Sequence, residues 1–204
     1  RSAPAETLMI DNPCGLLGIE FVEFTGPDPD RLDRLFRCLG FSLLKRHTER
    51  DVAYYRQNDI HFLLNREADG VARQFGALHG PSICSMGWRV RDAREAIGEA
   101  VRRGARAYEG APLYVAPAIY GIGDSLIHFI ERGAPGFYLD RFADLDPPHV
   151  EPDKGFLAID HLTNNVRRGT METWARFYKE VFGFTEVRYF DIRGAKTGLT
   201  SSSL

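Results

Sequence analysis

The sequence contains few cysteines, and their arrangement excludes two common uses of this residue. Only Cys14, Cys38 and Cys84 occur in 204 residues, and no CxxC pair is present. An odd and scattered set supports neither a disulfide framework nor a zinc site built from such pairs. We therefore expect three reduced thiols that pack as small apolar side chains, and a cytoplasmic protein.

Long apolar runs and an excess of positive charge are also missing. No apolar stretch approaches the roughly 20 residues that cross a bilayer, so we expect no contact with a membrane. Residues 1–7 lack the apolar core of a secretory signal and contain no methionine, which indicates a processed chain or a fragment. The formal net charge is −2, so no basic surface for nucleic acid is expected.

Local motifs of catalysis and metal binding are absent as well. The six histidines show neither HxH nor HxxxH spacing, and neither GxSxG nor a P-loop occurs. The glycine-containing residues 121–124 precede a strand-like stretch instead of a helix, which favours a turn over a phosphate site.

A weak internal repeat is present, with copies that start near Ile19, Met86 and Ile159, a period of about 70 residues. Each copy has the pattern of a strand, a helix and two or three further strands. In the first copy, residues 18–24 alternate apolar and acidic side chains, which is typical of a half-buried strand. A helix should follow Asp28, and two strands should cover 52–57 and 60–65, joined by a turn at 58–59.

The second and third copies repeat this order. Residues 85–90 and 125–131 resemble strands, and a helix should begin after Asp92, which forms a capping box with Glu95. The third copy predicts strands at 156–163 and 185–190 and a helix over 171–182, with Trp174 and Tyr178 packed on the sheet of that copy.

Residues 140–154 separate the second copy from the third and are rich in aspartate and proline. The run 144–148 contains two prolines, which are unsuited to a helix interior or a central strand. We therefore expect two domains, residues 1–145 and residues 146–204.

His161 is the best candidate for a metal ligand among the histidines. It lies in the middle of the strand predicted at 156–163, on the same face as Thr163 and Asn165, while alternation should direct Asp160 to the other face. A polar stripe is unexpected on a core strand. A face that is simply solvated is the alternative interpretation.

The stretch 159–201 resembles bacterial-type 4-hydroxyphenylpyruvate dioxygenase, and residues 12–16 and 79–81 agree with it. The matching segments in the third copy are Ile159-Asp160-His161-Leu162-Thr163-Asn164-Asn165-Val166-Arg167-Arg168-Gly169, Trp174-Ala175-Arg176-Phe177-Tyr178, Arg188-Tyr189-Phe190-Asp191-Ile192-Arg193-Gly194 and Thr197-Gly198-Leu199-Thr200-Ser201. The resemblance implies an α+β protein of repeated βαβββ modules, the vicinal-oxygen-chelate fold, with the third module incomplete.

The resemblance also implies a function. The family uses Fe(II) and O₂ to convert 4-hydroxyphenylpyruvate into homogentisate and CO₂ in tyrosine and phenylalanine catabolism, with iron held by two histidines and one glutamate. His161 matches the first iron ligand and Ser201 a substrate-contacting serine, whereas the other two ligands lie beyond residue 204 in the family. The 204-residue chain should therefore be an inactive N-terminal portion of a homo-oligomeric enzyme.

The first two copies should form a metal-free scaffold. Phe21 and Trp88 align with His161 and cannot bind a metal, so we expect both on the concave face of one sheet. Two other functions remain open: a non-catalytic binding protein of the same fold, and hydroxymandelate synthase, which uses the same substrate.

Overall fold

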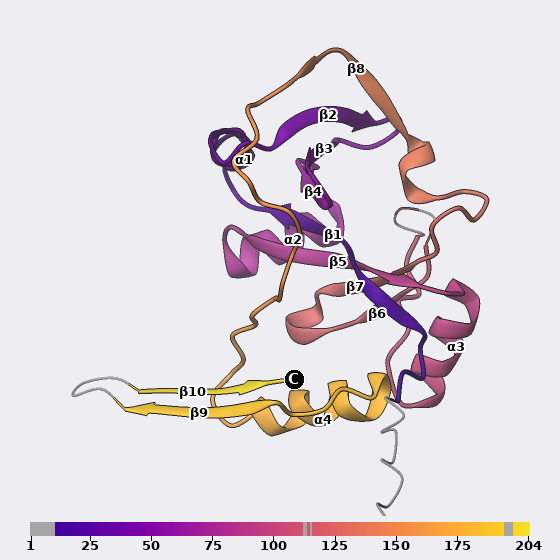
Figure 1. Cartoon of the computed structure of the whole chain (residues 1–204), viewed down its shortest axis with the longest axis vertical. Coiled ribbons are helices and arrows are strands. Elements are labelled where there is room, and N and C mark those ends of the chain that lie inside the picture. Colours follow the sequence, from indigo (N-terminus) through magenta and orange to yellow (C-terminus); the bar gives the residue numbers. More distant parts are fainter. Residues whose placement is uncertain (1–10, 112–113, 115, 194–197) are drawn as a thin grey trace, which may run out of the picture.

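A computed structural model describes residues 11–111, 114, 116–193 and 198–204. Most of the chain forms one mixed sheet of eight strands with helices packed on it, and a two-stranded sheet lies beside the last helix (Figure 1). The strands of the large sheet follow the spatial order β6-β7-β5-β1-β4-β3-β2-β8.

Several elements lie where the repeat predicts them, and α2 and β8 are additional. The strands are β1 (Leu16–Thr25), β2 (Ser42–His47), β3 (Val52–Gln57), β4 (Ile60–Asn65), β5 (Ser82–Val90), β6 (Ala118–Tyr120), β7 (Leu126–Ile130), β8 (Phe142–His149), β9 (Arg188–Arg193) and β10 (Gly198–Ser203). The helices are α1 (Pro29–Cys38), α2 (Gly70–His79), α3 (Ala93–Arg102) and α4 (Met171–Phe182), with 3₁₀ turns η1 (Ile122–Asp124) and η2 (Tyr138–Arg141). In the described part of the chain, no helix is both long and apolar enough to cross a membrane.

The first two copies meet at the centre of the large sheet. β1 pairs antiparallel with β5, β1 pairs parallel with β4, and β5 pairs parallel with β7. The proline-containing strand β8 pairs only with β2 and therefore lies at an edge, where a missing N–H does not interrupt a ladder.

Both predicted helix caps are confirmed. The Asp28 carboxylate accepts a hydrogen bond from the Arg31 backbone N–H at 3.0 Å, and Asp92 accepts one from Glu95 at 2.8 Å. These bonds satisfy amides that have no partner within the first helical turn.

The sequence pattern does not predict helix α2, because its glycines lower helix propensity. One of them, Gly76, allows a close approach to β1. A Cβ atom at that position would lie 3.0 Å from Thr25 Oγ1, whose hydroxyl donates to Ala72 O.

The two faces of the large sheet carry different sets of side chains. Helices α1, α3 and α4 cover one face, which we call the helix-covered face; its buried residues include Phe36, Ala100 and Phe182. The other face, here the inner face, is packed by Phe21, Leu63, Tyr114, Tyr138 and Phe142.

The prediction that Phe21 and Trp88 share one face is wrong for Trp88. The β1–β5 register is shifted between Ile19 and Phe21, so that Phe21 lies opposite Gly87 on the inner face. A Cβ atom at Gly87 would lie 2.4 Å from the Phe21 ring, so glycine is needed there. Trp88 packs on the helix-covered face, where its ring centroid is 4.7 Å from that of Phe182.

The strand predicted at 156–163 is wrong. Among the described strands, none pairs with this segment, so its backbone is not held in a ladder. The segment is extended and mostly exposed, and Ile159 and Leu162 contact the apolar clusters of the helix-covered face. The strand predicted at 185–190 is confirmed in part, since β9 starts at Arg188 and pairs with β10.

Helix α4 forms as predicted, but its buried face has a different partner. Phe182 and Val181 are buried in the cluster that contains Trp88, and the Tyr178 ring lies 6.2 Å from the Trp88 ring. The buried residues of this helix therefore pack on the large sheet, and the helix also contacts β10. Trp174 is only partly buried and contacts the ring of Phe177.

Because Trp174 is only partly buried, its replacement by alanine should cost about 1–2 kcal/mol of unfolding free energy, less than the roughly 3–5 kcal/mol of a fully buried aromatic. Urea unfolding measures this loss, with the exposed Val187→Ala as the control. A loss above about 3 kcal/mol would show that Trp174 belongs to the core.

Candidate functional site

His161 lies on the exposed segment that joins β8 to α4. Its side chain is 77% exposed, and Nδ1 lies 2.7 Å from Oδ2 of Asp160. The prediction that Asp160 points away is therefore wrong. Side-chain alternation holds only where the backbone is in a strand, and here neighbouring side chains can meet.

The contact with Asp160 determines what the imidazole can do. If Nδ1–H donates to the carboxylate, Nε2 keeps its lone pair and is free to bind a metal ion. A carboxylate on the other ring nitrogen is the usual way in which a metal-binding histidine is oriented. The geometry therefore suits His161 to act as a single ligand through Nε2.

The described residues do not complete a metal site around His161. Within these ranges, no group of three or more His, Cys, Asp or Glu side chains is arranged to hold a metal ion. Ferrous oxygenase sites need three protein ligands. A single imidazole does not meet that requirement, so His161 needs two further ligands to hold iron.

Ser201, the second predicted site residue, lies in β10. Its register partner is Phe190 in β9, and the serine is partly buried. His161 and Ser201 thus belong to separate elements, the segment before α4 and the hairpin after it.

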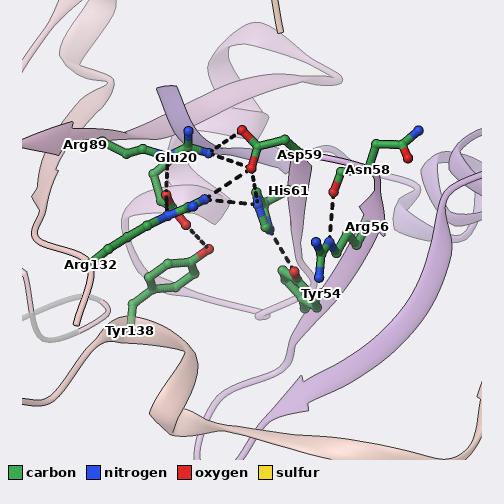
Figure 2. A network of polar contacts seen from close by, with 9 residues as sticks. All are labelled: Glu20, Tyr54, Arg56, Asn58, Asp59, His61, Arg89, Arg132 and Tyr138. Atoms are coloured by element: carbon green, nitrogen blue, oxygen red, sulfur yellow. Dashed lines mark hydrogen bonds and ion pairs between the residues drawn. The ribbon is translucent and has the colours of Figure 1, made fainter. Parts of the chain in front are cut away.

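Sequence reasoning missed a network of charged side chains next to the inner face (Figure 2). Glu20 is 1% exposed, and its Oε2 accepts hydrogen bonds from Nε of Arg89 and Nε of Arg132, each at 2.6 Å. Both guanidinium groups also contact Asp59, at 3.0 and 3.3 Å. Tyr138 donates to the other Glu20 oxygen at 3.2 Å. The negative charges of Glu20 and Asp59 therefore balance the positive charges of Arg89 and Arg132.

A second buried carboxylate, Glu23, is held by neutral donors. Asn65 Nδ2 donates to it at 2.9 Å, and the hydroxyls of Ser85 and Tyr114 also donate. The alternating pattern of 18–24 predicts acidic side chains on a solvated face, yet Glu20 and Glu23 are both buried. Their partners lie far away in the sequence, so no local pattern could have identified them.

Two histidines on strands of the large sheet, His61 in β4 and His128 in β7, are buried. Burial lowers the pKa of His128 to about 4, and its ring packs between those of Phe21 and Tyr114. Burial also lowers the pKa of His61, whose Nδ1 lies 2.7 Å from the Tyr54 hydroxyl. Both rings pack against aromatic side chains.

Comparison with known proteins identifies relatives over nearly the whole chain. A family model described as "Hydroxyphenylpyruvate dioxygenase, HPPD, N-terminal" matches residues 10–143. Protein MelA of Shewanella colwelliana is 55% identical over 196 residues, which cover 95% of this chain and 57% of that protein. A 4-hydroxyphenylpyruvate dioxygenase of Pseudomonas sp. (strain P.J. 874) is 42% identical, with 96% of this chain and 57% of the enzyme covered. The chain thus spans little more than half the length of these relatives.

A solved structure supports the fold. A xylose isomerase-like TIM barrel/4-hydroxyphenylpyruvate dioxygenase fusion protein superimposes with a TM-score of 0.79 at 24% identity, covering 98% of this chain and 32% of that protein. The vicinal-oxygen-chelate fold expected from the sequence is confirmed.

Proposed function

Because the chain belongs to the 4-hydroxyphenylpyruvate dioxygenase family, we propose that it is the N-terminal part of an Fe(II)-dependent dioxygenase. The full-length protein converts 4-hydroxyphenylpyruvate and O₂ into homogentisate and CO₂. The observation that carries this proposal is the 42% identity to a dioxygenase of that name, which extends over 96% of the chain.

The chain divides into two parts with different tasks. Residues 1–145 form a scaffold domain, whose inner face is filled with aromatic side chains and balanced charges. Residues 146–204 open the catalytic domain and contribute His161 as one iron ligand and Ser201 as a contact for the substrate. The second histidine and the glutamate come from residues beyond 204, as in the family.

The chain's own contribution at the metal is the placement of one imidazole. His161 binds through Nε2 of a neutral ring, and its Nδ1–H donates a hydrogen bond to the Asp160 carboxylate. The distance between Nδ1 and Oδ2 is 2.7 Å. Ferrous iron, once held by all three ligands, supplies the activation of O₂.

The small molecules 4-hydroxyphenylpyruvate and O₂ are the partners of the full-length protein, which we place in tyrosine and phenylalanine catabolism as a homo-oligomer. The three unpaired cysteines support a reducing compartment, and we propose the cytoplasm.

Metal analysis, oxygen uptake and product identification on the full-length protein test this function. We expect one iron per chain and turnover to homogentisate, whereas residues 1–204 alone should hold no stoichiometric iron and show no turnover. Formation of 4-hydroxymandelate would reassign the product, and a full-length protein without iron or oxygen uptake would favour a non-catalytic binding protein. Full activity from residues 1–204 would contradict the proposed ligand set.

A further inference from the structure

The turn between β3 and β4 contacts the segment that leads to His161. Gln57 Oε1 accepts hydrogen bonds from the backbone N–H groups of Lys154 and Phe156, at 2.8 and 3.3 Å. Asn58 Nδ2 donates to Phe156 O at 2.7 Å and to Asp153 Oδ2 at 3.1 Å. We call Gln57, Asn58 and Asp59 the 57–59 turn, and residues 153–157 the connecting segment.

A backbone hydrogen bond completes the contact between these two parts. The Asp59 N–H donates to Leu157 O at 3.1 Å. The connecting segment has no neighbouring strand among the described residues, so the 57–59 turn satisfies backbone groups that a ladder would otherwise satisfy.

The 57–59 turn is itself held firmly on the first sheet. Gln57 is buried, and its Nε2 donates to Leu39 O at the end of α1, at 2.9 Å. The Asp59 carboxylate contacts Arg89 and Arg132, which both bind the buried Glu20 (Figure 2). The charge network therefore connects the turn to β1, to β5 and to the residues that follow β7.

Beyond the connecting segment, two apolar contacts flank His161. Ile159 packs against both apolar clusters of the helix-covered face, and Leu162 packs against one of them. Between these two contacts, the side chains of Asp160 and His161 are 95% and 77% exposed. The exposed histidine thus lies between two weak apolar contacts, and the hydrogen bonds of the 57–59 turn hold the chain that leads to it.

We propose that the 57–59 turn is a positioning element for His161, with Gln57 and Asn58 as positioning residues. This inference rests on the proposed function for the role of His161 as an iron ligand. A mobile connecting segment would place the imidazole correctly only part of the time. The apparent affinity for iron falls in proportion to that fraction.

Two variants of the full-length protein separate this role from general stability. Asn58→Gly removes two side-chain hydrogen bonds and keeps the turn, because Asn58 has φ 50° and glycine adopts positive φ readily. Gln57→Met keeps the length of the side chain and removes its hydrogen bonds. Asp124→Gly is the matched control, since this exposed residue also has positive φ and lies next to β7.

Hydrogen exchange and iron titration are the measurements. In Asn58→Gly and Gln57→Met, the amides of Lys154 and Phe156, which donate to Gln57, and of Asp59, which donates to Leu157 O, should exchange about tenfold faster. This is expected when one or two hydrogen bonds are lost, while β1 and β5 exchange as before. The dissociation constant for ferrous iron should rise by about three- to tenfold. Saturating iron should restore kcat, which a merely unfolded protein would not allow, and Asp124→Gly should change none of these quantities.

The outcomes are distinct. Unchanged exchange at Lys154, Phe156 and Asp59 in both variants, or faster exchange with unchanged iron affinity, would overturn the positioning role. If Gln57→Met fails to fold, the exposed Asn58→Gly alone decides the question. A wild-type protein that binds no iron would overturn the proposed function instead, and the exchange of the Lys154, Phe156 and Asp59 amides would then decide whether the turn holds the connecting segment.

Discussion

Replacement of His161 by alanine in the full-length protein should abolish turnover of 4-hydroxyphenylpyruvate, lowering kcat by more than about 1,000-fold, or over 4 kcal/mol in the barrier. A ferrous site with three protein ligands loses one of them and does not retain its metal in the required geometry. The fold should remain, because the side chain is 77% exposed and contacts only the neighbouring Asp160 within hydrogen-bond distance. The free energy of unfolding should change by about 0.5 kcal/mol or less.

The measurements are iron content per chain, oxygen uptake and urea unfolding of the same preparation. Thr163→Ala is the matched control, because Thr163 is exposed on the same segment and has no proposed ligand role. Asp160→Asn tests the orientation of the ring, since the amide oxygen still accepts from Nδ1–H but carries no charge. Wild-type iron content in His161→Ala would show that the ligand set inherited from the family does not apply to this chain.

Replacement of Glu20 by alanine should destabilise the first domain by roughly 3–5 kcal/mol, the usual cost of breaking a buried ion pair from one side. The Glu20 carboxylate is 1% exposed and receives hydrogen bonds from two guanidinium groups and the Tyr138 hydroxyl. Without it, Arg89 and Arg132 share only the half-exposed Asp59. Positive charge then remains beside the inner face without a buried counterion.

Urea unfolding followed by the fluorescence of Trp88 and Trp174 measures this loss. Asp144→Ala is the control, since it removes an exposed ion pair with Lys45 and should cost no more than about 1 kcal/mol. A loss below about 1 kcal/mol for Glu20→Ala would mean that Asp59 alone is sufficient for both arginines.

Much of the local structure could be predicted from the sequence. Asp28 and Asp92 mark the starts of α1 and α3, because each carboxylate satisfies amides within three residues of itself. The strand-like residues 52–57 and 60–65 predict β3 and β4, and the Asn58-Asp59 pair predicts the turn between them. These features depend on residues close together in the chain, and the resemblance of 159–201 to the dioxygenase family likewise lies in contiguous residues.

The predictions that the structure contradicts concern features that depend on residues far away in the chain. A strand at 156–163 needs a neighbouring strand, and without one among the described residues Asp160 turns toward His161 instead of away from it. The face on which Trp88 lies depends on a register shift in β1.

The sequence by itself therefore determined several elements of the first two copies, the caps at Asp28 and Asp92, the turn at 58–59 and the family. The tertiary structure alone decided which charges are buried and what holds the segment before His161. Glu20 binds Arg89 and Arg132, which lie 69 and 112 residues away in the sequence. Gln57 binds Lys154, which lies 97 residues away. Such pairs arise only when the sheet brings distant strands together, because burial of a charge is tolerated only where the fold supplies its partner.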